Sequence, residues 1–247
     1  MFIRIATILK RGQELMFFGI LAAVAVCTCY YFKATNPEYI AYKEASTKLD
    51  QQHIEDVTKR IDYLVWALRN KPELACKVAL KLEKAKQIPA AIALIHGTIA
   101  NNSQNLLVVK TYATILWKDQ KAEMGLSVIS LYEEGGGKTD YATQATKSAM
   151  LISTGKYLEA ISTLQKLQTT DEEGNQHNLK TDKVTGPLLA EAMMRSGNIA
   201  SGMLIYKELI AANPTDKMLR ITYARTLITS AQADAERTMN KSRISKL

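Results

Sequence analysis

Cysteine is scarce in this sequence, with three residues in 247. Cys27 and Cys29 lie together in an apolar block near the start, so Cys76 is the single thiol in the rest of the sequence. No disulfide can therefore form within that larger region, and cysteines cannot build a metal site there. The three histidines are isolated and lack the spacing of metal ligands, so we expect no metal and no cofactor.

Proline and glycine are also few. The sequence holds five prolines and twelve glycines, while hydrophobic residues make up 47% of it. A chain of this length and composition can bury a core, and the shortage of helix breakers favours helices. We therefore predict an all-α fold.

No constellation of residues indicates catalysis or nucleic-acid binding. A nucleophile, a base and an acid cannot be nominated together, so we expect a protein that is not an enzyme and has no small-molecule substrate. The formal net charge is +8, but the lysines are scattered among glutamates and form no basic stripe. We interpret them as a solvated surface rather than a nucleic-acid site.

The stretch "EEGGGKTD", residues 133–140, is the one that suggests a phosphate-binding loop. Such a loop needs a glycine six residues before its lysine, and the residue six before Lys138 is Tyr132. Glycine directly after an apolar periodic segment is the usual end of a helix, because it adopts positive φ without steric cost. We predict a helix stop at Gly135, followed by a new helix that Asp140 caps.

An uncharged segment, "LMFFGILAAVAVCTCYYF", fills residues 15–32. As a helix it would span roughly 27 Å, close to the hydrocarbon thickness of a bilayer. Aromatic residues stand at both ends, where membrane interfaces favour them. We predict a transmembrane anchor; the alternative is a buried helix of a soluble protein.

Neither a convincing cleavage site nor the small residue that precedes a lipoprotein cysteine is present, so an uncleaved anchor is favoured. Three positive charges stand on each side of the anchor, and the tight Lys10–Arg11 pair decides the orientation. We predict a cytoplasmic basic tail over 1–14 and a translocated C-terminal region.

Behind the anchor, residues 33–71 are predicted to be a helical connector. Asn36, Pro37 and Glu38 form a helix start with a cap, a first-turn proline and an early acid. Apolar residues at helical spacing then indicate a second helix over 54–68, and Pro72 begins the next one.

From residue 72 the sequence repeats, with two small residues twelve positions apart in each repeat. The later members of the pairs are 34, 35 and 42 residues apart. Large apolar residues bracket every pair. Two antiparallel helices can cross closely only where both side chains are small. The pairs are Ala79 and Ala91, Ala113 and Gly125, Ser148 and Ala160, and Ala190 and Gly202.

This pattern resembles the tetratricopeptide repeat, a helix-turn-helix of 34 residues. "STGKYLEAISTLQKL" and "RSGNIASGMLIYKELIAANP" carry the resemblance best, with Gly155 and Gly197 at the turn; Lys86 and Gln120 replace that glycine in the first two units. The resemblance implies a right-handed α-solenoid of about four units over 72–214, with a polar insert near 169–183. A capping helix over 215–237 and a basic tail over 238–247 complete the prediction.

In tetratricopeptide proteins the first helix of each unit lines a concave groove that binds peptides or proteins. Trp117 would anchor an apolar side chain of a partner, unless it packs against a neighbouring helix. Lys110 and Arg195 would hold acidic groups, unless they are ordinary surface residues. The resemblance places nine residues on this face: Leu80, Glu83, Lys110, Thr114, Trp117, Ile152, Glu191, Met194 and Arg195.

The layout of basic tail, single span and degenerate repeats is similar to the YfgM-like ancillary subunits of the SecYEG translocon. That resemblance implies a bacterial inner-membrane protein with a periplasmic C-terminal domain. Its partners would be the translocon, a membrane-tethered chaperone and unfolded exported clients. Two alternatives are a scaffold subunit of an envelope secretion, pilus or polysaccharide-export machine, and a mitochondrial membrane tetratricopeptide receptor.

Overall fold

The computed structural model describes residues 36–167 and 182–244. These residues form twelve helices and no strand, so the protein is all-α as predicted. The chain divides into two compact units, Met1–Asn102 and Ser103–Leu247, which are described separately here. The boundary falls between the first and second predicted repeats.

Among the described helices, none combines the length and the apolar character needed to cross a membrane. The predicted anchor over 15–32 lies outside the described residues. So does most of the predicted polar insert, of which the structure describes only Asp182 and Lys183.

Five helices form the described part of the first unit. Asn36 caps the first of them, since its side chain accepts a hydrogen bond of 2.9 Å from the Glu38 amide. The predicted helix over 54–68 is divided into two helices by a tight turn after Thr58, where the Arg60 amide donates to the Val57 carbonyl three residues back. The helices are α2 (Pro37–Asp50), α3 (Ile54–Thr58), α4 (Ile61–Leu68), α5 (Pro72–Lys84) and α6 (Ile88–Ile99).

Helices α5 and α6 form a hairpin, and α2 and α4 contact it and each other. Ion pairs join α2 to its neighbours on both sides. Lys81 Nζ on α5 lies 2.6 Å from an Asp50 carboxylate oxygen, and the Arg60 guanidinium pairs with Glu44. The described part of the predicted connector, residues 36–71, is therefore packed against the first repeat.

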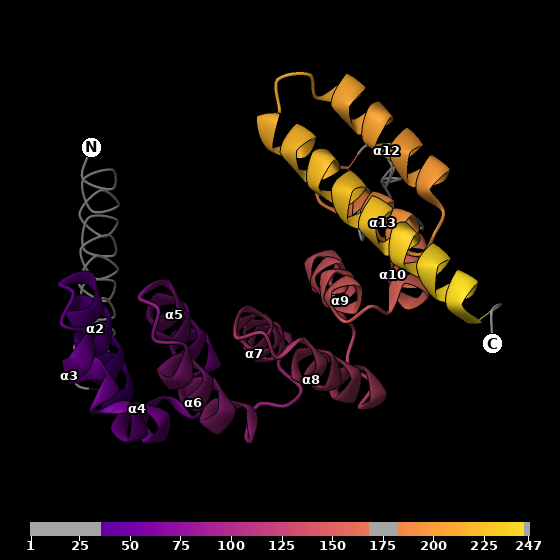
Figure 1. Ribbon diagram of the computed structural model, residues 1–247. Helices are drawn as coiled ribbons and strands as arrows, with labels where there is room; N and C mark the ends of the chain where they lie inside the picture. Colours follow the sequence, from indigo (N-terminus) through magenta and orange to yellow (C-terminus); the bar gives the residue numbers. More distant parts are fainter. Residues whose placement is uncertain (1–35, 168–181, 245–247) are drawn as a thin grey trace, which may run out of the picture. The chain divides into compact units, whose positions relative to one another are not determined.

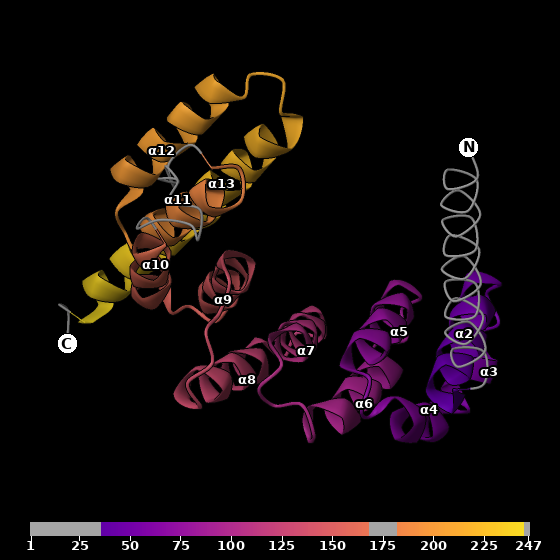
Figure 2. The ribbon, with the colours of Figure 1, turned by 180° about the vertical axis from the view of Figure 1, so that it is seen from behind.

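The described part of the second unit consists of three helix hairpins followed by one long helix (Figure 1). Each first helix of a hairpin contacts the first helix of the next, and each second helix contacts the following first helix. Figure 2 shows the same succession from behind. The helices are α7 (Leu106–Lys118), α8 (Ala122–Glu134), α9 (Tyr141–Ser153), α10 (Tyr157–Lys166), α11 (Thr185–Arg195), α12 (Ile199–Ala212) and α13 (Lys217–Ile244).

The predicted small residues lie inside the hairpins, and all eight are buried. A Cβ atom added to Gly125 would stand 3.0 Å from the Ala113 carbonyl oxygen. The corresponding distance from Gly202 to the Ala190 carbonyl oxygen is 2.6 Å. The close approach of two helices at paired small residues is thus confirmed for these two hairpins.

The turn inside each of the four hairpins contains one residue with positive φ. Gly155 and Gly197 have φ of 79° and 104°, while Lys86 and Gln120 have 64° and 61°. In each case the next amide donates to the carbonyl five residues back, as from Lys121 to Leu116. Lys86 and Gln120 therefore take the glycine conformation, and the repeat keeps its turn without the glycine.

The glycines of "EEGGGKTD" end a helix, as predicted. Gly136 has φ of 84°, and the Gly137 amide donates to the Tyr132 carbonyl. An added Cβ at Gly137 would stand 2.4 Å from the Tyr132 ring. The ring thus packs over the glycine run.

Helix α13 is longer than expected. The capping helix was predicted to end at residue 237 and to give way to a basic tail, but α13 continues to Ile244. Residues 238–244 contain neither glycine nor proline, so nothing in this segment forces the helix to stop.

Candidate protein-binding surface

The nine predicted groove residues are divided between the two units. Leu80 and Glu83 lie on α5 of the first unit, and the other seven lie on α7, α9 and α11 of the second. The Leu80 side chain is partly open to solvent, with 38% of its surface exposed. The second unit therefore carries most of the predicted surface.

Two of the seven are not on an accessible face. Ile152 is 4% exposed and Met194 is 1% exposed. Helix α9 contacts α7, α8, α10 and α11, and α11 contacts α9, α10, α12 and α13. Because four other helices contact each of these two helices, little of either surface is open to solvent. Ile152 and Met194 therefore belong to the core and do not line a groove.

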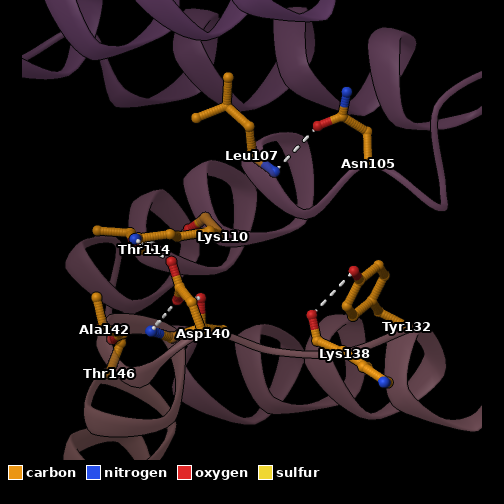
Figure 3. A network of polar contacts seen from close by, with 10 residues as sticks. Asn105, Leu107, Lys110, Thr114, Tyr132, Lys138, Asp140, Ala142 and Thr146 are labelled. Atoms are coloured by element: carbon orange, nitrogen blue, oxygen red, sulfur yellow. Dashed lines mark hydrogen bonds and ion pairs between the residues drawn. The ribbon is translucent and has the colours of Figure 1, made fainter. Parts of the chain in front are cut away.

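Lys110 holds the beginning of α9 rather than standing free. Its ammonium group lies 3.1 Å from an Asp140 carboxylate oxygen, and Thr114 donates to the Lys110 carbonyl at 2.7 Å (Figure 3). Asp140 caps α9 by accepting from the Thr143 amide at 2.7 Å. Lys110 thus joins α7 to the start of the next hairpin.

These contacts change the acidity of Asp140. Burial favours the neutral form of its carboxyl, but the hydrogen bonds from Thr143 and the ammonium group of Lys110 outweigh that effect and lower the pKa. The carboxylate is therefore ionised at neutral pH, where it stabilises the positive end of the α9 dipole.

A pocket of about 380 Å³ opens beside Trp117, at the turn between α7 and α8 and the end of α9. Trp117 is half-buried, and Met124 is 52% exposed. Charged and hydroxyl groups line the pocket together with these apolar side chains. A pocket with both apolar and polar lining suits the side chain of a bound peptide. The lining includes Trp117, Lys121, Glu123, Met124, Ser153 and Thr154.

A second pocket, of about 410 Å³, lies between α11 and α13. Arg195 forms an ion pair of 2.8 Å with Glu191, and Arg225 adds a second guanidinium from α13. The two arginines outnumber the one carboxylate, so the pocket suits an acidic group on a partner. The lining from α13 was missed, because α13 was interpreted only as a cap; it includes Thr222, Arg225, Thr226 and Ile228.

Within residues 36–167 and 182–244, no group of three or more histidine, cysteine, aspartate or glutamate side chains is placed to hold a metal ion. No protein-family model matches the sequence, and no curated protein matches it significantly. The tetratricopeptide resemblance therefore stays a prediction from the sequence pattern.

Proposed function

We propose that this protein binds other proteins through the first helices of its second unit. The observation that carries the proposal is the succession of α7, α9, α11 and α13, with a pocket near each end of that succession. The Trp117 pocket is suited to an apolar side chain and the Arg195 pocket to an acidic one. A helix-hairpin stack of this kind would be a right-handed tetratricopeptide-like solenoid, working without catalysis.

The cellular setting follows from the sequence layout. A single anchor over 15–32 would hold the hairpins at a membrane surface, which favours an ancillary translocon subunit or a chaperone for exported proteins. A fixed scaffold subunit of an envelope machine would use the same anchor and surface. A mitochondrial receptor is the third setting.

Capture of partners by the full-length chain tests the binding surface. We expect Trp117→Ala to lose most partner capture, because it removes the largest apolar anchor of the pocket. Trp66→Ala is the matched control, since Trp66 is 58% exposed and lies on α4 in the other unit. Equal capture by the two variants would remove Trp117 from the binding surface.

Site-specific photocrosslinking from Met124 in intact cells separates the settings. Crosslinks to many exported proteins and to the translocon would support the chaperone function. Crosslinks to one partner in a fixed stoichiometry would support the scaffold function instead.

A further inference from the structure

The outer face of α13 differs from the same face of the other first helices. Ala224 stands where Ala113, Ser148 and Ala190 stand in α7, α9 and α11, as the first small residue of its repeat. Those three residues are fully buried, each at 0% exposure, whereas Ala224 is exposed.

The next turn shows the same contrast. Leu227 aligns with Leu116 and Leu151, which are 1% and 4% exposed, and with the half-buried Met193, yet Leu227 is 36% exposed. In α7, α9 and α11 this face is covered by the second helix of the hairpin. Helix α13 thus carries the surface of a first helix, and no second helix covers it within the described chain.

The uncovered face is apolar and runs along one side of the helix. Its residues recur at alternating spacings of three and four, which places them on a single stripe. Ile221 and Ile228 are 43% and 59% exposed, although the end of a helix stack normally has a polar outer face. We define the α13 stripe as Ile221, Ala224, Ile228, Ala231 and Ala235.

We propose that the α13 stripe binds a second copy of this chain, with the two α13 helices antiparallel about a two-fold axis level with residue 226. In this arrangement Ile221 faces Ala231 of the other copy, and Ala224 faces Ile228 of the other copy. Each layer formed by Ile221, Ala224, Ile228 and Ala231 therefore joins one large and one small apolar side chain. This interlocking is what an isologous interface requires. Ala235 lies level with Lys217 of the other copy.

The charges along α13 favour the same arrangement. An antiparallel pair centred level with residue 226 overlaps over residues 217–235. Within this overlap the basic residues Lys217, Arg220 and Arg225 all precede the acidic residue Asp234, so the basic end of one segment lies against the acidic end of the other. The remaining basic residues of α13, Arg237, Lys241 and Arg243, lie beyond the overlap. Arg220 lies level with Gln232 of the other copy, two residues from Asp234 and on the same flank of the stripe, whereas a parallel pair would bring Arg220 near Arg225. The Arg220 guanidinium also donates a hydrogen bond to the Pro214 carbonyl of its own chain.

We expect the dimer to be weak and reversible, because a single helix face buries less than the roughly 800 Å² per partner of a stable interface. The test is sedimentation of the full-length chain in detergent micelles over a hundredfold range of protein concentration. The mean protein mass should rise from one copy toward two. A chain that remains monomeric throughout this range would overturn the proposal.

The variant Ala224→Glu/Ile228→Glu should remain monomeric at every concentration. Both side chains are exposed, so helix content and the melting temperature should stay close to those of the wild type. Leu158→Glu on α10 is the control, because Leu158 is 76% exposed and lies off the stripe; it should dimerise like the wild type. Unchanged dimerisation of the double variant would assign self-association to another part of the chain.

Charge variants test the orientation. Arg220→Glu should weaken the dimer by about fivefold, and adding Asp234→Arg to the same chain should restore it. In a parallel pair, Arg220→Glu would instead strengthen the dimer by pairing with Arg225. The antiparallel arrangement also brings the two Arg225 side chains together at the rim, so Arg225→Ala should tighten it.

Discussion

The carbonyl oxygen of Ala190 lies so close to Gly202 that a Cβ atom at residue 202 would stand 2.6 Å from it. Met194 leaves no more room, since its Cγ would be 2.3 Å from the same Cβ. Gly202→Ala must therefore push α12 away from α11. We expect a net loss of about 1–3 kcal/mol in the free energy of unfolding, measured by urea denaturation, despite the higher helix propensity of alanine.

Gly125→Ala is the control for this prediction. Its added Cβ would meet the Ala113 carbonyl oxygen at 3.0 Å and the flexible Met150 side chain at the same distance. A small shift of Met150 can relieve part of the contact, so the loss should be smaller than for Gly202→Ala. Equal losses in the free energy of unfolding for the two variants would show that the close spacing of α11 and α12 at Gly202 does not cause the destabilisation.

Lys86 and Gln120 pay a conformational cost that glycine would avoid, since both have positive φ in the hairpin turns. Lys86→Gly and Gln120→Gly should each stabilise the fold by about 1 kcal/mol, seen as a higher urea midpoint. Lys77→Gly, at an exposed position in the interior of α5, should destabilise the fold by a similar amount. Stabilisation by Lys77→Gly would contradict the explanation that the positive φ causes the gain.

Features decided within a few residues could be predicted from the sequence. The cap at Asn36, the helix stop at the glycine run and the cap at Asp140 each depend on local chemistry, and the structure confirms all three. The small pairs were also visible, because a close crossing demands small side chains at fixed spacing.

Whether an individual side chain is buried or open to solvent could not be predicted in the same way. Ile152 and Met194 follow the helical spacing of groove residues, but their helices are enclosed by four neighbours, and a periodic pattern does not reveal how many sides are covered. The end of α13 was missed for a related reason, since no residue after 237 marks a stop. The pocket between α11 and α13 could not be predicted either, because it exists only when α13 packs against α11 as the first helix of a further repeat would.

Asp140 should make the fold sensitive to acid. Its carboxyl has a lowered pKa in the folded state, so its ionised form stabilises the fold above the unfolded pKa of about 3.9. That stabilisation is lost as the pH falls from about 4 through the folded pKa. The urea midpoint, measured between pH 6 and pH 2.5, should therefore decrease as the pH is lowered below about 4.

Two variants separate the charge of Asp140 from its capping role. Asp140→Asn keeps an oxygen that can accept from the Thr143 amide, so it should lose less stability at neutral pH and show a weaker dependence on acid. Asp140→Ala removes the cap as well and should cost about 1–2 kcal/mol at pH 7. An unchanged acid dependence in both variants would exclude Asp140 as its source.

Tyr206 should control how firmly α13 is held. Its ring is fully buried, and its hydroxyl lies 3.2 Å from the Thr226 hydroxyl on α13. Tyr206→Phe keeps the ring but removes this link and the hydrogen bond of 3.4 Å that the hydroxyl donates to the Pro187 carbonyl on α11. The loss should cost about 1 kcal/mol and speed amide hydrogen exchange in α13 more than in α7. Tyr132→Phe removes the bond to the Lys138 carbonyl instead and serves as the control.

Alkali provides an independent check on the same tyrosine. Burial raises the pKa of Tyr206 to about 12, above the usual value near 10. Its neutral form therefore stabilises the fold fully below pH 10, and that stabilisation is lost as the pH rises from 10 to 12. Tyr206→Phe should flatten the fall of the urea midpoint over this range, whereas an unchanged slope would show that the ionisation of Tyr206 does not drive alkaline unfolding.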